Sequence, residues 1–361
     1  MNRAHQSLPR RQAGFSLVEL MIALTIGFMI IAGVGYLYLG SREAFRTQDS
    51  LTTIQENARF ALQTMSHDIR MAGYMGCGNL SNITPNIIAS AISPLSPATA
   101  LVVFPGGAGW TAPASITRKS GTDVLRVSRA SGGNVTAYTP ASSMSGTPPK
   151  PSAVQINANP NNFIQKNDVV LISNCQTADV FAVTNNVTGG SSLSFGIAGG
   201  LNTYNKLANV YNQTAVPPAQ VYKFYQTDYF IGCPTASYSG GTCSVPWALY
   251  QSVNGVPTAL VDNVENVAYW LGVDTSGTSP PAGVVGAYQS PTTVAAANNW
   301  ANVLSVQVHL LLVGGAKNDT NSNVNTTAQT YTFNGATTTA SGNDRRLYQE
   351  AVATVAIRNR L

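Results

Sequence analysis

An uninterrupted apolar stretch near the N-terminus constrains this chain more than any other feature. From Phe15 to Ser41 the sequence holds one charged side chain, Glu19, and no proline. Such a stretch can cross a bilayer as a helix, which takes about 20 residues. A charge at bilayer depth costs about 3 kcal/mol on insertion scales, so Glu19 needs a partner or a purpose. We therefore predict one membrane-spanning helix with a functional charge near its start.

The residues before this stretch predict its orientation. Arg3, Arg10 and Arg11 precede it, and basic residues beside a membrane helix favour the cytoplasmic side. This places the chain after Ser41 across the inner membrane. A cleavable secretory signal fits poorly, because the apolar run is too long and no small-residue cleavage site follows it. A simple signal anchor, with Glu19 reaching back to the interface, is the alternative.

The segment GFSLVE, residues 14–19, resembles the class III signal of type IV pilins and type II secretion pseudopilins. The resemblance implies that a prepilin peptidase cleaves after Gly14 and that the new N-terminus on Phe15 is methylated. It also implies that Glu19 pairs with the terminal amine on Phe15 of a neighbouring subunit during assembly. Opposite charges attract strongly in a low dielectric. A contact within one chain is the alternative, because the two residues are four apart on one helix.

The helix is expected to continue beyond the membrane. Between Pro9 and Pro85 the sequence has no proline, so nothing there forbids a helix. An apolar stripe recurs at spacings of three or four residues and comprises Leu51, Ile54, Ala58, Ala61, Met65, Ile69 and Ala72. Gly73 and Gly76 then end the pattern. We predict one helix from Phe15 to about Ala72, roughly 85 Å long.

The chain after this helix has the character of a β-rich head. We predict strands at residues 123–128, 168–174, 179–184, 221–231, 303–313 and near the C-terminus, and a hairpin over 247–261 that turns at Asn254–Gly255. Segments rich in Ser, Thr, Asn, Gly and Pro are expected to be surface loops, at 131–162, 275–298 and 314–345. The predicted fold class is α+β and pilin-like, with a long N-terminal helix packed on a large antiparallel β-rich head.

The sequence therefore predicts four segments. They are a cleaved leader at 1–14, a transmembrane or filament-core helix at 15–40, an amphipathic helix at 41–72, and a head at 73–361. The head is long enough for one large domain or two lobes.

Cysteine usage supports export. All four cysteines follow the apolar run: Cys77, Cys175, Cys233 and Cys243. An even number in an oxidising compartment predicts disulfides, and four cysteines allow three pairings. We favour Cys233–Cys243, because the nine residues between them include a proline and two glycines and can fold back. The remaining pair, Cys77–Cys175, would tie the end of the helix to the β-rich body. No spacing resembles a zinc site.

Composition and motifs argue against nucleic-acid binding and catalysis. The net charge is +5, but without the three leader arginines 17 basic residues face 15 acidic ones. No basic stripe with interleaved aromatics is present. His67 and His309 are each expected at the surface, and no nucleotide-binding, hydrolase or zinc-protease motif occurs. We therefore expect no enzymatic activity, no cofactor and no metal.

Four segments along the rest of the chain make the family resemblance more specific. They are DIRMAGYMGC (68–77), SNCQTADVF (173–181), VDNVENVAYWLGVDT (261–275) and DRRLYQEAVATVAIRNR (344–360). With the N-terminal segment they resemble the PilW family of large minor pilins over essentially the whole mature chain. The resemblance implies a subunit that helps prime type IV pilus assembly and sits at the tip with other minor pilins. It implies as partners the prepilin peptidase, the other pilins including the major pilin, the inner-membrane assembly machinery and a tip adhesin.

Three other functions are alternatives. A minor pseudopilin of type II secretion has the same N-terminal physics, but the length and the later strings argue against it. An adhesin or DNA-uptake tip protein would be favoured by aromatic or basic residues in 131–162 or 275–298, which hold few. A membrane-anchored periplasmic enzyme would need a catalytic constellation.

Overall fold

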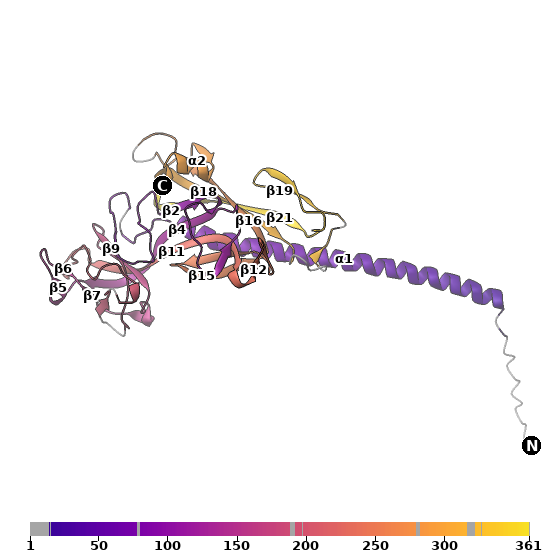
Figure 1. Ribbon diagram of the computed structural model, residues 1–361, viewed down its shortest axis with the longest axis horizontal. Helices are drawn as coiled ribbons and strands as arrows, with labels where there is room; N and C mark the ends of the chain where they lie inside the picture. The colour runs from indigo at the N-terminus through magenta and orange to yellow at the C-terminus, as the bar shows by residue number, and fades with distance from the viewer. Residues whose placement is uncertain are drawn as a thin grey trace, which may run out of the picture.

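One unbroken helix leads into a β-rich head. The computed structural model describes residues 14, 16–77, 80–187, 192–196, 198–278, 282–315, 322–325 and 327–360. Helix α1 (Leu17–Arg70) has 54 residues and leaves the head as a long rod (Figure 1). It ends two residues before the expected Ala72, and Gly73 follows with φ +76°, a left-handed conformation that favours glycine.

The two halves of α1 have opposite environments. The first half is exposed apart from the half-buried Gly27, with apolar side chains such as Phe28 and Met29 uncovered. The second half buries one face, formed by Ile54, Ala58, Ala61, Met65, Asp68 and Ile69. Five of these residues belong to the stripe expected from the spacing of apolar residues, because positions three and four apart share a helix face. Leu51 of that stripe is half-buried, and Asp68 was not expected on this face.

The larger sheet contains 11 strands in the described part of the chain. They are β1 (Asn86–Ile87), β2 (Leu101–Phe104), β3 (Ile116–Arg118), β4 (Val124–Tyr138), β7 (Ala153–Ile156), β8 (Val169–Ser173), β9 (Ala178–Ala182), β10 (Ser192–Ser194), β11 (Ala219–Pro234), β14 (Ala248–Val253) and β15 (Val256–Asp262). The order β1-β9-β8-β11-β4-β7-β10 forms its main path, with β2, β3, β14 and β15 joined at the side. Antiparallel β4 and β11 are its longest strands.

The smaller sheet has four antiparallel strands. Its order is β17 (Ala287–Gln289), β16 (Val264–Val273), β18 (Val303–Val313) and β21 (Tyr348–Ala356). A short helix, α2 (Pro291–Ala296), precedes β18. Three small hairpins complete the fold: β5 (Met144–Ser145) with β6 (Lys150–Pro151), β12 (Tyr238–Ser239) with β13 (Thr242–Cys243), and β19 (Thr330–Phe333) with β20 (Ala336–Thr339). The expected α+β, pilin-like fold is confirmed.

The main core lies where α1 meets both sheets. Its buried stripe packs with side chains such as Leu125 and Tyr229 of the larger sheet and Val308 and Leu310 of the smaller one. Two further apolar clusters continue along the larger sheet beyond the end of α1. The head is therefore elongated, and strand β9, which contributes Phe181 to one of these clusters, lies far from the exposed half of α1 (Figure 1).

The prediction of a surface loop at 131–162 is wrong. Strand β4 continues to Tyr138, and β7 buries Val154 and Ile156. Glycine here reflects close packing rather than a loop: a Cβ on Gly133 would come within 2.0 Å of the Tyr222 ring. Small polar residues lie between the buried apolar residues of these strands, so the composition of the segment hides the apolar–polar alternation that predicts a strand. The segments 275–298 and 314–345 are also partly structured, since they contain β17, α2 and the β19–β20 hairpin.

The hairpin over β14 and β15 has the expected turn. Asn254 and Gly255 have φ values of +49° and +86°, as a type I′ turn requires. Of the other expected strands, 303–313 coincides with β18, and 221–231 lies inside β11.

Two disulfides brace the head. Cys77 and Cys175, with Cα atoms 5.0 Å apart, join the segment after α1 to the turn between β8 and β9. Cys233 and Cys243, 6.5 Å apart, join the end of β11 to β13. The first bond therefore fastens the end of α1 to the larger sheet.

A buried carboxylate joins α1 to the larger sheet. The side chain of Asp68 accepts hydrogen bonds from Arg129 Nε of β4 at 2.9 Å and from the Tyr229 hydroxyl of β11 at 2.9 Å. Tyr229 in turn accepts a hydrogen bond from Gln251 of β14 at 3.1 Å. Burial raises the pKa of Tyr229, and the negative charge of Asp68 raises it further. The Tyr229 hydroxyl therefore keeps its proton and remains a hydrogen-bond donor. One helical residue thus contacts two strands directly and a third through Tyr229.

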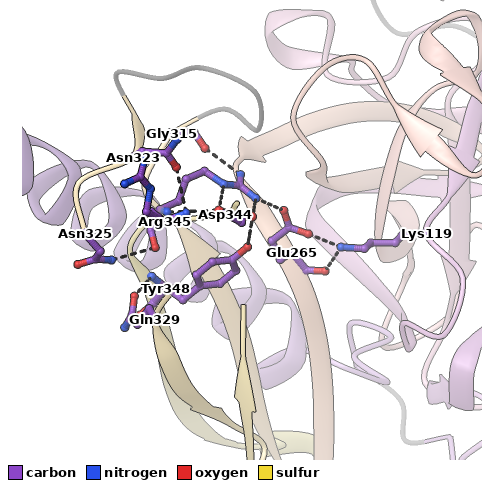
Figure 2. A network of polar contacts seen from close by, with 10 residues as sticks. Lys119, Glu265, Gly315, Asn323, Asn325, Gln329, Asp344, Arg345 and Tyr348 are labelled. Atoms are coloured by element: carbon purple, nitrogen blue, oxygen red, sulfur yellow. Dashed lines mark hydrogen bonds and ion pairs between the residues drawn. The ribbon is translucent and has the colours of Figure 1, made fainter. Parts of the chain in front are cut away.

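A chain of charges joins the two sheets (Figure 2). Lys119, just after β3, pairs with Glu265 of β16. Glu265 accepts from Arg346 at 3.2 Å, and Arg346 also contacts Asp344 at 2.8 Å. Tyr348 of β21 donates its hydroxyl hydrogen to Asp344 at 2.7 Å. These contacts connect the larger sheet to the start of the last strand of the smaller sheet.

Replacing Asp68 by alanine should destabilise the head strongly. Arg129 would be left largely buried without its counter-charge, which costs about 3 kcal/mol in comparable pairs. The measurement is denaturant unfolding of the detergent-solubilised chain. Asp49→Ala is the matched control, since Asp49 lies exposed on the same helix and should change stability by less than about 0.5 kcal/mol. Equal stability of both variants would contradict the role of Asp68.

The Asp344 contacts should make the stability of the head sensitive to acid. Burial alone would raise the pKa of Asp344, but hydrogen bonds from Arg346 and Tyr348 outweigh it and hold the pKa at about 2. Because this lies below the ordinary value, the contribution is complete above about pH 4 and is lost as the pH falls toward 2. The difference in thermal stability between wild type and Asp344→Asn should therefore be constant above about pH 4 and should shrink as the pH falls from about 4 toward 2. A difference that is constant with pH would refute this.

Candidate processing and assembly site

The expected cleavage point lies directly before α1. Gly14 is exposed, and Ser16 has extended backbone angles and precedes the first helical residue. Phe15, the expected first residue after cleavage, lies outside the described residues. A Cβ added at Gly14 would meet no atom within 4 Å. The chain itself therefore tolerates a side chain at this position, and any sequence requirement for glycine would come from an enzyme that acts on it.

Glu19 lies in the first turn of α1 and is exposed. A carboxylate there interacts favourably with the partial positive charge of a helix N-terminus. Its neighbours Leu17, Leu20 and Met21 are exposed apolar side chains. The described part of the chain gives Glu19 no ion-pair partner. In an apolar medium, an ion-pair partner for Glu19 would therefore come from another molecule or from the N-terminus.

The first half of α1 has the length and composition of a membrane span. Among the described residues α1 is the one helix that qualifies, and none of its most apolar window is buried in the chain. An apolar helix face left uncovered by its own protein requires lipid or other helices as its surroundings. The same segment therefore serves as an anchor and offers a surface to neighbouring helices.

The two histidines differ in their surroundings. His67 is exposed as expected, with 66 % of its side chain accessible. The expectation for His309 is wrong, since only 12 % of its side chain is accessible and its Nδ1 lies 2.7 Å from Glu350. The tip of the β19–β20 hairpin lies over this part of the sheet, where Asn334 donates a hydrogen bond to Glu350 at 2.8 Å. Sequence patterns did not indicate this cover, because the hairpin lies in a segment that was expected to be a loop.

A cleft of about 680 Å³ lies between the β12–β13 hairpin and the start of β16. Its charged lining residues are Lys119, Glu265 and Arg346, which pair with one another. No nucleophile lies beside a general base among the residues lining it. In the described part of the chain no group of three His, Cys, Asp or Glu side chains is placed to hold a metal ion.

Comparison with known protein families identifies two segments. Residues 244–359 match the family of type IV pilus-assembly protein W, PilW. Residues 9–35 match the prokaryotic N-terminal methylation motif, which covers Gly14, Glu19 and the start of α1. No curated protein and no solved structure matches the chain.

The first matched segment builds β14, β15 and the whole smaller sheet, and the second contains the candidate processing site. Both agree with the family expected from the sequence, which is confirmed. These matches imply a structural component that works with pilus machinery and other pilins, anchored by its apolar N-terminal helix. The chain is thus similar to the PilW family of type IV pilus-assembly proteins over residues 244–359 and carries the N-terminal methylation motif of prepilin-type proteins.

Proposed function

We propose that this chain is a minor pilin that helps prime type IV pilus assembly and is incorporated at the pilus tip with other minor pilins. The observation that carries the proposal is the helix α1, whose exposed apolar half holds one charge and whose other half is locked into a large head. Such a helix can be drawn from lipid into a bundle of similar helices without disturbing the head. Neither step requires catalysis or a cofactor.

In this proposal a prepilin peptidase removes residues 1–14, and Phe15 becomes the methylated N-terminus. Residues 15–40 form the membrane and later filament segment, residues 41–72 carry the amphipathic half, and 73–361 form the head. The N-terminus faces the cytoplasm and the head the periplasm until the subunit enters the pilus at the cell surface. The leader arginines and the disulfide-bonded head support this orientation.

Glu19 is the residue that we assign to registration between subunits. Its carboxylate would pair with the terminal amine on Phe15 of a neighbouring helix, where the low dielectric makes the attraction strong. The lack of an ion-pair partner for Glu19 in the described residues supports this. The remaining partners are the other minor pilins, the major pilin, the inner-membrane assembly machinery and a tip adhesin.

Loss of the chain should remove most pili from the cell surface. In a deletion strain the sheared surface fraction should contain little pilin, and the intact gene should restore it. Gly14→Val should fail to restore it and should retain the leader, because a bulky side chain obstructs the peptidase while the chain itself accommodates it. Normal piliation of the deletion strain would contradict the proposal and direct attention to secretion of exported enzymes, the task of a pseudopilin.

Removing the charge of Glu19 should impair assembly without impairing insertion. Glu19→Ala should enter the membrane at least as well as wild type, since a charge costly in lipid is lost. Its amount in sheared pili should fall about tenfold if the lost pairing is worth about 1.4 kcal/mol. Glu56→Ala, an exposed acid on the head half of α1, is the matched control. Equal incorporation of the two variants would refute the registration role.

A further inference from the structure

The cleft beside the β12–β13 hairpin has the size of a ligand site. Its volume is about 680 Å³. Sites for small molecules in proteins usually enclose about 300–1,000 Å³. The hairpin supplies one part of the lining, and the start of β16 and the residues just after β3 supply others. The disulfide between Cys233 and Cys243 fastens the hairpin to the end of β11. The cleft therefore has a covalently fastened wall.

The charged groups that line this cleft already have partners. Lys119 pairs with Glu265 and also donates a hydrogen bond to the backbone carbonyl of Glu265 at 2.8 Å. Arg346 contacts Glu265 at 3.2 Å and Asp344 at 2.8 Å (Figure 2). A charged ligand would have to compete with these ion pairs, whereas a neutral ligand leaves them intact. The lining therefore favours a neutral ligand.

The rest of the lining combines hydroxyl groups with aromatic rings. Tyr238 and Trp247 are half-buried, and their ring centroids lie 6.2 Å apart in an edge contact. Hydroxyl groups, which both donate and accept hydrogen bonds, come from Ser120, Ser237, Ser239, Thr242 and Ser244. A sugar has the matching composition, because its hydroxyls form hydrogen bonds and the C–H faces of its ring pack on aromatic side chains.

One polar atom of the lining residues lacks a partner. The side-chain oxygen Oδ1 of Asn263 is buried and has no hydrogen-bond donor in the described part of the chain. Buried polar atoms are normally paired, and an unpaired one is unfavourable. A hydroxyl group bound beside Asn263 would supply the donor that this oxygen needs. Asn263 therefore points to a ligand that carries hydroxyls.

We propose that this cleft binds a neutral sugar. Asn263 accepts a hydrogen bond from a sugar hydroxyl, the ring packs beside Trp247, and the serine and threonine hydroxyls form further hydrogen bonds. Two sources have this chemistry: N-acetylated sugar chains of the cell's own envelope, and neutral glycans on an external surface. Sugar binding requires no partner subunit, so it is independent of the proposed role in assembly.

A glycan array tests the class of ligand. The full chain, solubilised in detergent and labelled, is applied to N-acetylglucosamine oligomers, neutral hexose oligomers and sialylated glycans on one surface. We expect at least one of the two neutral groups to retain the chain, and the group that does so identifies the source. Retention by sialylated glycans alone, or by no glycan, would overturn the proposal.

A matched pair of substitutions tests the place of binding. Asn263→Gly removes the unpaired amide, and glycine accepts the φ of +60° at this position, so the variant should fold. Its dissociation constant for the retained oligosaccharide should rise about tenfold, as expected when one hydrogen bond is lost. Asn298→Gly is the control, because Asn298 also has a positive φ, +49°, and is exposed outside the cleft. It should leave the dissociation constant unchanged.

A charge placed in the wall provides a second variant. Thr242→Glu adds an unpaired carboxylate to the exposed β13 strand and should weaken binding by at least about tenfold, since a neutral ligand cannot compensate it. Thr337→Glu, on exposed β20 outside the cleft, should have no effect. Thermal unfolding shows which variants are folded. Unchanged affinity in both folded cleft variants, or equal losses in their controls, would show that the sugar binds elsewhere and would overturn the cleft as its site.

Discussion

The structure depends on the burial of the second half of α1 between two sheets. This packing supplies most of the contacts that hold helix and sheets together, and apolar burial of this kind is non-directional. Burial alone would allow the helix to shift along its axis by a turn. The bonds from Asp68 to Arg129 and Tyr229 remove that freedom, because a displaced carboxylate would lose both partners in a buried place. Apolar burial holds the helix, and one polar contact sets its register.

The first half of the same helix presents the opposite situation. Its apolar side chains and Glu19 have no cover from the described part of the chain. Since exposed apolar surface of this size is unfavourable in water, this half is stable in lipid or among other helices. An unbroken helix joins the two environments, so a displacement of the exposed half is transmitted directly to the head. This rigidity suits the assembly step that we propose, in which the subunit leaves the membrane as a unit.

Local patterns in the sequence were sufficient to predict part of this fold. The stripe on α1 and the turn at Asn254–Gly255 were predicted because the physics of each involves neighbouring residues. The strands within 131–162 were missed because small polar residues obscured two short alternations. The links from Asp68 to Arg129 and from Glu265 to Arg346 join residues 61 and 81 positions apart, which no local pattern reveals. The sequence feature that hinted at the first of these links was an acidic residue, Asp68, directly beside Ile69 of the apolar stripe.

The two matched segments are physically dependent on each other. The smaller sheet lies entirely within residues 244–359, yet its inner face is completed by α1, and the start of β16 is held by Lys119, which follows β3 of the larger sheet. The N-terminal motif, in turn, occupies the exposed half of the helix that supplies this core. Residues 54–69 lie between the two segments and connect them through one rigid element. A head without the second half of α1 would expose the inner face of the smaller sheet, so this half of the helix and the head form one folding unit.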